Sequence, residues 1–210
     1  MFIGHYGLGM GAKKLAPQTS LGTLLLATNW IDLIWPFFLL LGWESVKIVP
    51  GITKLTPFDF HYPYSHSLSA VVGWALLLGG IHFFFKKNIK AAIVIGLLVV
   101  SHWFLDFWVH RPDMPLFING GPFLGLGFWN SWTITLLSEF TVYSIGLAMF
   151  LNTKRKPNRW FWALATILPI FYIVFMFSPP PPNQMAVALT GFTQWLIVGW
   201  GYLADRDISK

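Results

Sequence analysis

Six long apolar runs divide this chain, and short clusters of proline, glycine and charged residues separate them. The runs cover residues 19–43, 64–85, 89–109, 131–151, 159–178 and 185–204. Crossing a hydrocarbon core of ~30 Å takes about 20 helical residues, so each run is long enough to span a membrane. The pattern predicts an all-α fold, a polytopic membrane helix bundle with six transmembrane helices in a single integral membrane domain over residues 1–210.

The residues before Lys13 are also apolar, but as a helix they reach only ~18 Å, which is too short to cross. Lys13 and Lys14 follow this stretch instead of preceding it. This is not the charge order of a signal peptide, so we expect the segment to remain in the mature protein. It either folds back into the bundle as an N-terminal half-helix that carries His5 inward, or lies on the cytoplasmic surface as an interfacial helix.

The composition supports a membrane protein. Hydrophobic residues make up 55% of the 210 residues and charged residues only 10%, against about 25% charged residues in soluble domains. The net charge of +6 comes from short basic clusters between the apolar runs, which argues against nucleic-acid binding. Since the chain has no cysteine, a disulfide, a thiolate nucleophile and a cysteine zinc site are excluded, and any metal must be held by histidine and carboxylate.

Lysine and arginine are unevenly divided between the two sides of the predicted bundle. One side carries Lys13, Lys14, Lys86, Lys87, Lys90, Lys154, Arg155, Lys156, Arg159, Arg206 and Lys210. The other side carries Lys47, Lys54 and Arg111. Since cytoplasmic loops are enriched in these residues, we expect both termini on the cytoplasmic side of a prokaryotic plasma membrane.

The third apolar run contains His102, Asp106 and His110 at intervals of four residues. On a helix this spacing places all three on roughly one face. An ionised carboxylate among apolar residues of a membrane helix costs several kcal/mol unless it is paired, hydrated or bound to a metal. The spacing therefore indicates a metal site or a proton path, with a hydrogen-bonded His–Asp pair as the structural alternative.

Other titratable residues fall inside or beside the apolar runs. Asp32 lies mid-span, and Pro36 predicts a kink beside it, while His66 begins the second run on the non-cytoplasmic side. Asp32 and Glu139 each have a structural alternative, in which the carboxylate only accepts hydrogen bonds from neighbouring groups. His82 is expected at the cytoplasmic interface.

By helix rise, His5, Asp32, His66, His102 and Asp106 can meet in the non-cytoplasmic half of the bilayer. The glycine-rich stretch 120–127 lies on the same side, and forms either a mobile rim of the site or a plain surface loop.

The ordered set GHYGLG, ATNWIDLIW, YSHSL and SHWFLD resembles a known pattern. It is similar to the membrane-bound metal-dependent hydrolase family, which is distantly related to zinc-dependent phospholipase C. The resemblance covers roughly residues 1–110, so residues 111–210 are expected to supply supporting helices.

The resemblance implies a ligand set. Asp32, His66, His102 and Asp106 would surround one zinc-like ion, and His5 together with bridging Asp106 would hold a second. The nucleophile would be a metal-bound water held by Asp32 and Asp106. His110 and Glu139 are weaker candidates, as remnants of a further site in which position 135 is threonine.

Together these features favour a zinc-type hydrolase that cleaves phosphoester or other ester bonds of a lipid or lipid-linked substrate. It would use one or two zinc ions or another divalent metal, since paired cations activate water and stabilise a phosphoester transition state. One alternative is a transporter or channel that passes divalent cations or protons through the same His/Asp cluster. Another is a non-catalytic scaffold with a structural metal.

Overall fold

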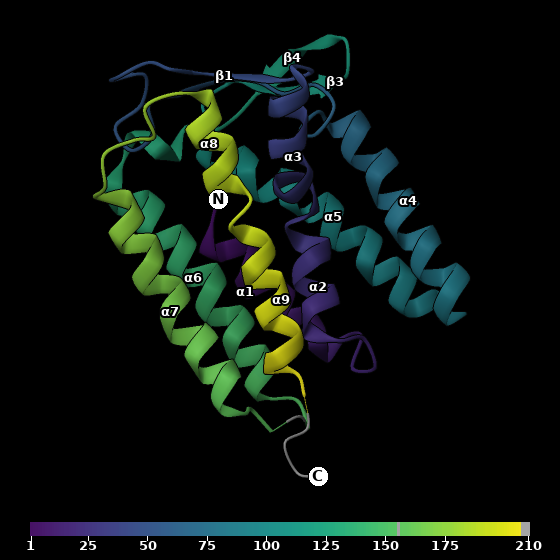
Figure 1. The fold of residues 1–210 in the computed structure, drawn as a ribbon. Coiled ribbons are helices and arrows are strands. Elements are labelled where there is room, and N and C mark those ends of the chain that lie inside the picture. The colour runs from purple at the N-terminus through teal and green to yellow at the C-terminus, as the bar shows by residue number, and fades with distance from the viewer. Residues whose placement is uncertain (155, 207–210) are drawn as a thin grey trace.

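The computed structural model describes residues 1–154 and 156–206. Helices dominate these residues, as predicted (Figure 1). The α-helices are α1 (Ile3–Gly11), α2 (Leu21–Thr28), α3 (Trp30–Leu41), α4 (Leu68–Lys86), α5 (Ile89–Val109), α6 (Trp132–Leu151), α7 (Arg159–Met176), α8 (Gln184–Gly191) and α9 (Gln194–Ala204). Two short 3-10 helices cover Ala12–Lys14 and Phe128–Asn130.

Four helices, α4 to α7, are long and apolar enough to cross a membrane. Each has a serine or an asparagine as its N-cap residue. The side chain of that residue accepts a hydrogen bond from a backbone N–H of the first turn. These caps are Ser67, Asn88, Ser131 and Asn158. The four predicted runs therefore agree with the structure to within a few residues.

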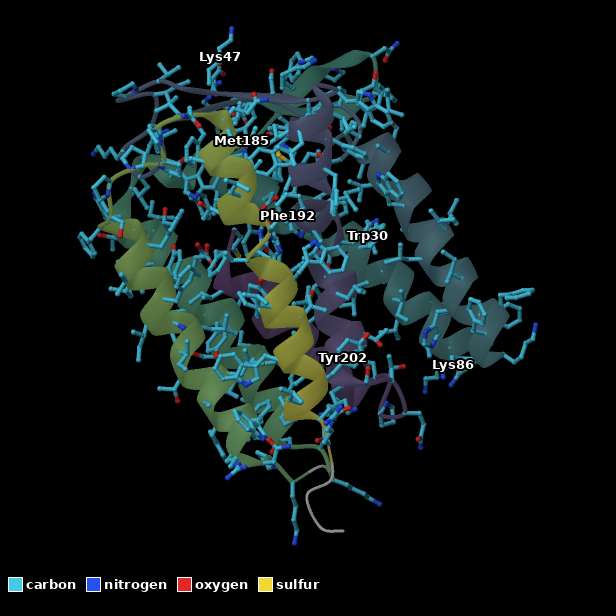
Figure 2. The ribbon with its side chains drawn as sticks, in the orientation of Figure 1. Trp30, Lys47, Lys86, Met185, Phe192 and Tyr202 are labelled. Atoms are coloured by element: carbon cyan, nitrogen blue, oxygen red, sulfur yellow. The ribbon has the colours of Figure 1, made fainter. Side chains whose placement is uncertain are left out.

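The other two predicted runs are broken helices. Residues 19–43 contain α2 and α3, which bend by 57° at Asn29, and together these two helices would make a fifth span. The bend lies about one turn before Asp32, although Pro36 predicted a kink beside that carboxylate. Residues 185–204 contain α8 and α9, with Phe192 at the break (Figure 2).

The two broken pairs lie side by side. Helix α2 packs on α9, and α3 packs on α8 (Figure 1). At Gly191 a β-carbon would lie only 2.6 Å from Pro36 Cγ, so this close approach of α8 to α3 depends on glycine.

Helix α1 lies inside the bundle, and of its nine residues only Leu8 is not buried. It packs on α6 with backbone against backbone, because Gly7 and Gly146 have no side chains to hold the helices apart. In Figure 1 the N-terminus accordingly lies within the outline of the molecule. The structure therefore has the inserted half-helix, not a helix on the surface.

Two small antiparallel hairpins, which the all-α prediction missed, lie at one end of the bundle (Figure 1). Strand β1 (Ser45–Ile48) pairs with β2 (Phe58–His61), and β3 (Met114–Phe117) pairs with β4 (Gly120–Leu124). The expectation of a loop over 120–127 is wrong for the residues in β4. Strands of four or five residues are too short to give a clear alternation in sequence.

The outer surfaces of the long helices are apolar. Leu76, Phe85 and Leu97 are among many large apolar side chains that are mostly exposed. Lys47 lies at the hairpin end of the molecule, and Lys86 lies at the end of α4 that is farther from the hairpins (Figure 2). Apolar belts of this extent are unusual on soluble proteins and suit contact with lipid.

Candidate metal centre

Five predicted ligands converge in the interior of the bundle. His5 comes from α1, Asp32 from α3, His66 from the turn before α4, and His102 and Asp106 from α5. Two overlapping groups have potential ligand atoms within 4.8 Å of one another: His5 with His102 and Asp106, and Asp32 with His66 and His102. The structure therefore brings together side chains separated by up to a hundred residues in sequence.

The break between α2 and α3 orients His102. Its Nδ1 lies 2.6 Å from the carbonyl oxygen of Thr28, the last residue of α2. Carbonyls in the last turn of a helix lack helical partners, and a carbonyl can only accept, so Nδ1 carries the proton. The unprotonated Nε2 then faces Asp106 Oδ2 at 3.0 Å and Asp32 Oδ1 at 3.7 Å.

His66 is oriented by a different partner. Its Nδ1 lies 2.6 Å from Ser65 Oγ, and the Ser65 hydroxyl donates to Glu44 Oε2 at 2.7 Å. Since that hydroxyl proton points to Glu44, Ser65 Oγ accepts from His66 Nδ1–H. The other ring nitrogen of His66, Nε2, lies 3.3 Å from Asp32 Oδ1.

Sequence reasoning missed Glu44. This buried carboxylate also accepts the backbone N–H groups of Tyr64 and Ser65 at 2.7 and 2.8 Å. Burial raises the pKa of Glu44, while these hydrogen bonds stabilise its ionised form. The signal available in the sequence was a lone glutamate directly after an apolar run, on the side of the membrane expected for His66.

Asp106 contacts both histidines of its own group and lies 3.9 Å from His66 Nε2 of the other, while His102 belongs to both groups. Its Oδ1 lies 3.0 Å from His5 Nε2, and the α-amino group of Met1 also contacts it. Its Oδ2 faces His102, whose ring stacks on that of His5 with 3.6 Å between centroids. The bridging role that the resemblance implies for Asp106 stays a prediction, since His5, His102 and Asp106 all belong to one group.

These residues fit a divalent metal ion. The Nε2 atom of His102 is buried without a hydrogen-bond partner, which is costly unless another group occupies the space before it. Imidazole nitrogen and carboxylate oxygen are the donor set that zinc accepts in sites without cysteine, and other divalent metals accept it too. The buried His/Asp groups could therefore hold a metal ion.

His110 belongs to neither group of candidate ligands. It is buried, although it was only a weaker candidate in the sequence. Its Nδ1 lies 3.0 Å from Asp113 Oδ1 and 3.1 Å from the Tyr62 hydroxyl. Burial lowers the pKa of His110, so its imidazole is neutral near neutral pH.

Glu139 also lies outside both groups. Its two carboxylate oxygens accept the backbone N–H groups of Phe2 at 2.7 Å and Gly4 at 2.9 Å. Glu139 therefore caps α1 and fixes the helix that carries His5, which matches the structural alternative for this residue.

A cavity of about 280 Å³ adjoins the cluster. Its polar end is lined by Asp32, His66, Asp106 and His110. Aromatic side chains of Trp35, Phe60 and Trp129 close part of this end, and the cavity continues along α7, α8 and α9. Helices expected only to support the site thus form part of its wall.

No protein-family model, curated protein or solved structure matches this chain. The resemblance to membrane-bound metal-dependent hydrolases thus stays a prediction, carried by the residues of the cluster alone.

Proposed function

We propose that the chain is an integral membrane hydrolase that uses a divalent metal, zinc being the first candidate, to cleave phosphoester or other ester bonds of a lipid or lipid-linked substrate. The convergence of His5, Asp32, His66, His102 and Asp106 beside a cavity carries this proposal. Two carboxylates gathered away from bulk solvent are stabilised by positive charge, and a bound divalent ion would add to the charge that the Met1 α-amino group supplies to Asp106.

The proposal includes six spans. Helices α4 to α7 supply four, and the pairs α2–α3 and α8–α9 would each cross as a broken helix. Broken helices are tolerated at membrane depth where they line a cavity, and both pairs contribute to this one. The excess of basic residues at the Lys86 end makes that end cytoplasmic, with the cluster towards the other side.

A bound metal would activate water and stabilise the charge that develops on the ester. Asp32 and Asp106 would hold the attacking water by accepting its hydrogen bonds. His110, with its Nδ1–H donated to Asp113, has Nε2 available to accept the water proton and return it to the leaving oxygen. Phe60 and Trp129 would exclude bulk water from this end of the cavity.

The decisive experiment is metal analysis of the purified protein with conservative variants. We expect stoichiometric divalent metal in the unmutated protein and its loss in His102→Gln and Asp106→Asn, which preserve side-chain size. His82→Gln is the matched control, because His82 lies one turn before Lys86 in α4 and outside both groups of candidate ligands. Metal-free unmutated protein would refute the proposal.

Activity is tested by adding a panel of phospholipids and other lipid esters in vesicles. Hydrolysis that a chelator removes and a divalent metal restores is the expected result. Metal-ion flux across liposomes, with no ester cleaved, would contradict the hydrolase and favour a transporter.

A further inference from the structure

The cavity beside the cluster has two chemically different ends. Its polar end holds the His/Asp side chains described above. The other end, called here the apolar arm, is lined by Phe171, Tyr172 and Phe175 of α7, Val187 of α8 and Ile197 of α9. A ligand that fills both ends must combine a polar group with an apolar one.

Several polar side chains that line the cavity near the apolar arm already have hydrogen-bond partners within the protein. The Thr190 hydroxyl donates to Ala186 O at 2.9 Å, and the Thr193 hydroxyl donates to Thr190 O at 2.7 Å. Gln194 Oε1 accepts the Tyr6 hydroxyl at 3.2 Å. Since the two threonine hydroxyls already donate to backbone carbonyls, they place little demand for a polar ligand on this wall.

The apolar arm extends from the interior to the outer surface of α7. Tyr172 and Val187 line it and are only 5% and 6% exposed. Phe171 and Phe175 also line it, yet they are 41% and 43% exposed. Since α7 is long and apolar enough to cross a membrane, the exposed side of these rings would face lipid.

The size of the cavity limits what it encloses. Pockets that bury a whole small molecule usually measure ~300–1,000 Å³, and this cavity is about 280 Å³ with both ends included. It therefore has room for a headgroup ester and one segment of chain, while the remainder of such a ligand stays in the bilayer.

We propose that the apolar arm between α7 and α8–α9 binds one hydrocarbon chain of a membrane lipid, which enters sideways from the bilayer with its ester at the His/Asp cluster. The role of this site in binding the substrate of a hydrolase rests on the proposed function. The binding of the chain depends on apolar contact alone and requires no metal.

Photolabelling of the unmutated protein tests the proposal. The probe is a phosphatidylglycerol with a diazirine in the middle of one acyl chain, mixed into phosphatidylethanolamine–phosphatidylglycerol vesicles. Lipid around the protein labels Val174 and Leu196, which are mostly exposed. We expect additional labelling of buried Tyr172 and Val187, and labelling confined to exposed positions would overturn the proposal.

Filling the apolar arm supplies the matched comparison. Ile197→Trp should abolish labelling of Tyr172 and Val187 while the labelling of Val174 persists, whereas the neighbouring exposed change Leu196→Trp should leave both patterns intact. Undiminished labelling of the buried residues in Ile197→Trp would contradict the proposed route.

Repeating the labelling on chelated protein separates the two proposals. Labelling of Tyr172 that persists after chelation would show that the chain site needs no metal. If the same protein then neither binds added divalent metal nor cleaves lipid, the hydrolase is refuted and the chain site is retained. Metal-dependent hydrolysis without labelling of Tyr172 and Val187 would support the hydrolase and refute the chain site.

Discussion

Both broken helix pairs contain an interruption between two consecutive helices, but the residues around the two interruptions differ in chemistry. In α2–α3 the break at Asn29 leaves the Thr28 carbonyl to accept from His102, and Asp32 follows within a turn. In α8–α9 the break follows Gly191, and the threonine hydroxyls there bond to their own backbone. The first pair therefore contributes the Asp32 carboxylate to the cavity, while the second contributes only uncharged side chains, with Val187 and Ile197 as its apolar ones.

The comparison teaches that a helix break does not by itself make a polar site. What matters is whether the freed backbone group meets a side chain that can use it, as the Thr28 carbonyl meets His102. Because α2 packs on α9 and α3 on α8, the polar and apolar walls face one cavity. An amphipathic ligand is the natural occupant of such a space.

The largest expected effect comes from forcing the two pairs apart at Gly191. Gly191→Val places atoms against Pro36, where a β-carbon already has only 2.6 Å, so α3 and α8 must separate and Asp32 must move. We expect a loss of about 3 kcal/mol in the free energy of unfolding, as for severe overpacking, together with loss of bound metal. Thermal unfolding in detergent and metal analysis measure the two effects.

Gly199→Val in α9 is the matched control, since no atom lies within 4 Å of a β-carbon at that position. Its thermal midpoint should be unchanged or slightly raised, because valine is the better helix former. An equal loss in both variants would show that the Gly191–Pro36 contact does not hold the pairs together.

Much of the candidate site was predictable because spacing and depth are simple functions of helix geometry. The interval from His102 to Asp106 places both on one face, and the helix rise brings Asp32 and His66 to a similar level. The long helices were predictable for the same reason, since about 20 apolar residues suffice to define a span.

The groups that orient the ligands were not predictable. The Thr28 carbonyl is a backbone atom whose availability depends on a bend that Pro36 only roughly indicated, and Glu44 acts through Ser65 across a turn of undetermined shape. The apolar arm was missed because apolar residues of α7 to α9 look alike in sequence whether they face lipid or a cavity. Tertiary packing, not local pattern, decides these features.

A smaller effect is expected from Glu44→Gln, which tests whether metal binding depends on the orientation of His66. The amide group would donate to Ser65, so the Ser65 hydroxyl would donate to His66 Nδ1 instead of accepting from it. The proton of His66 would then sit on Nε2, facing Asp32. We expect metal affinity to fall about 10- to 100-fold, as for other groups that orient ligands.

Nitrogen-15 spectra of the histidines measure this change of tautomer directly, and metal titration measures the affinity. Asp59→Asn is the control, because Asp59 pairs with Arg111 and belongs to neither group of candidate ligands, so the tautomer of His66 and the metal affinity should be unchanged. A normal tautomer in Glu44→Gln would show that Glu44 is not what orients His66.

The smallest expected effect concerns the one described side-chain hydrogen bond from α9 to the backbone of α3. Trp195 Nε1–H donates to Leu33 O at 3.1 Å, and Trp195→Phe should cost about 1 kcal/mol in unfolding free energy, the usual value of one such bond. Bound metal should be unchanged, since Leu33 lies outside both groups of candidate ligands. Trp162→Phe, at an exposed position of α7, controls for the loss of an indole. Loss of metal in Trp195→Phe would mean that α8–α9 also sets the geometry of the cluster. The contrast between α2–α3 and α8–α9 would then be wrong.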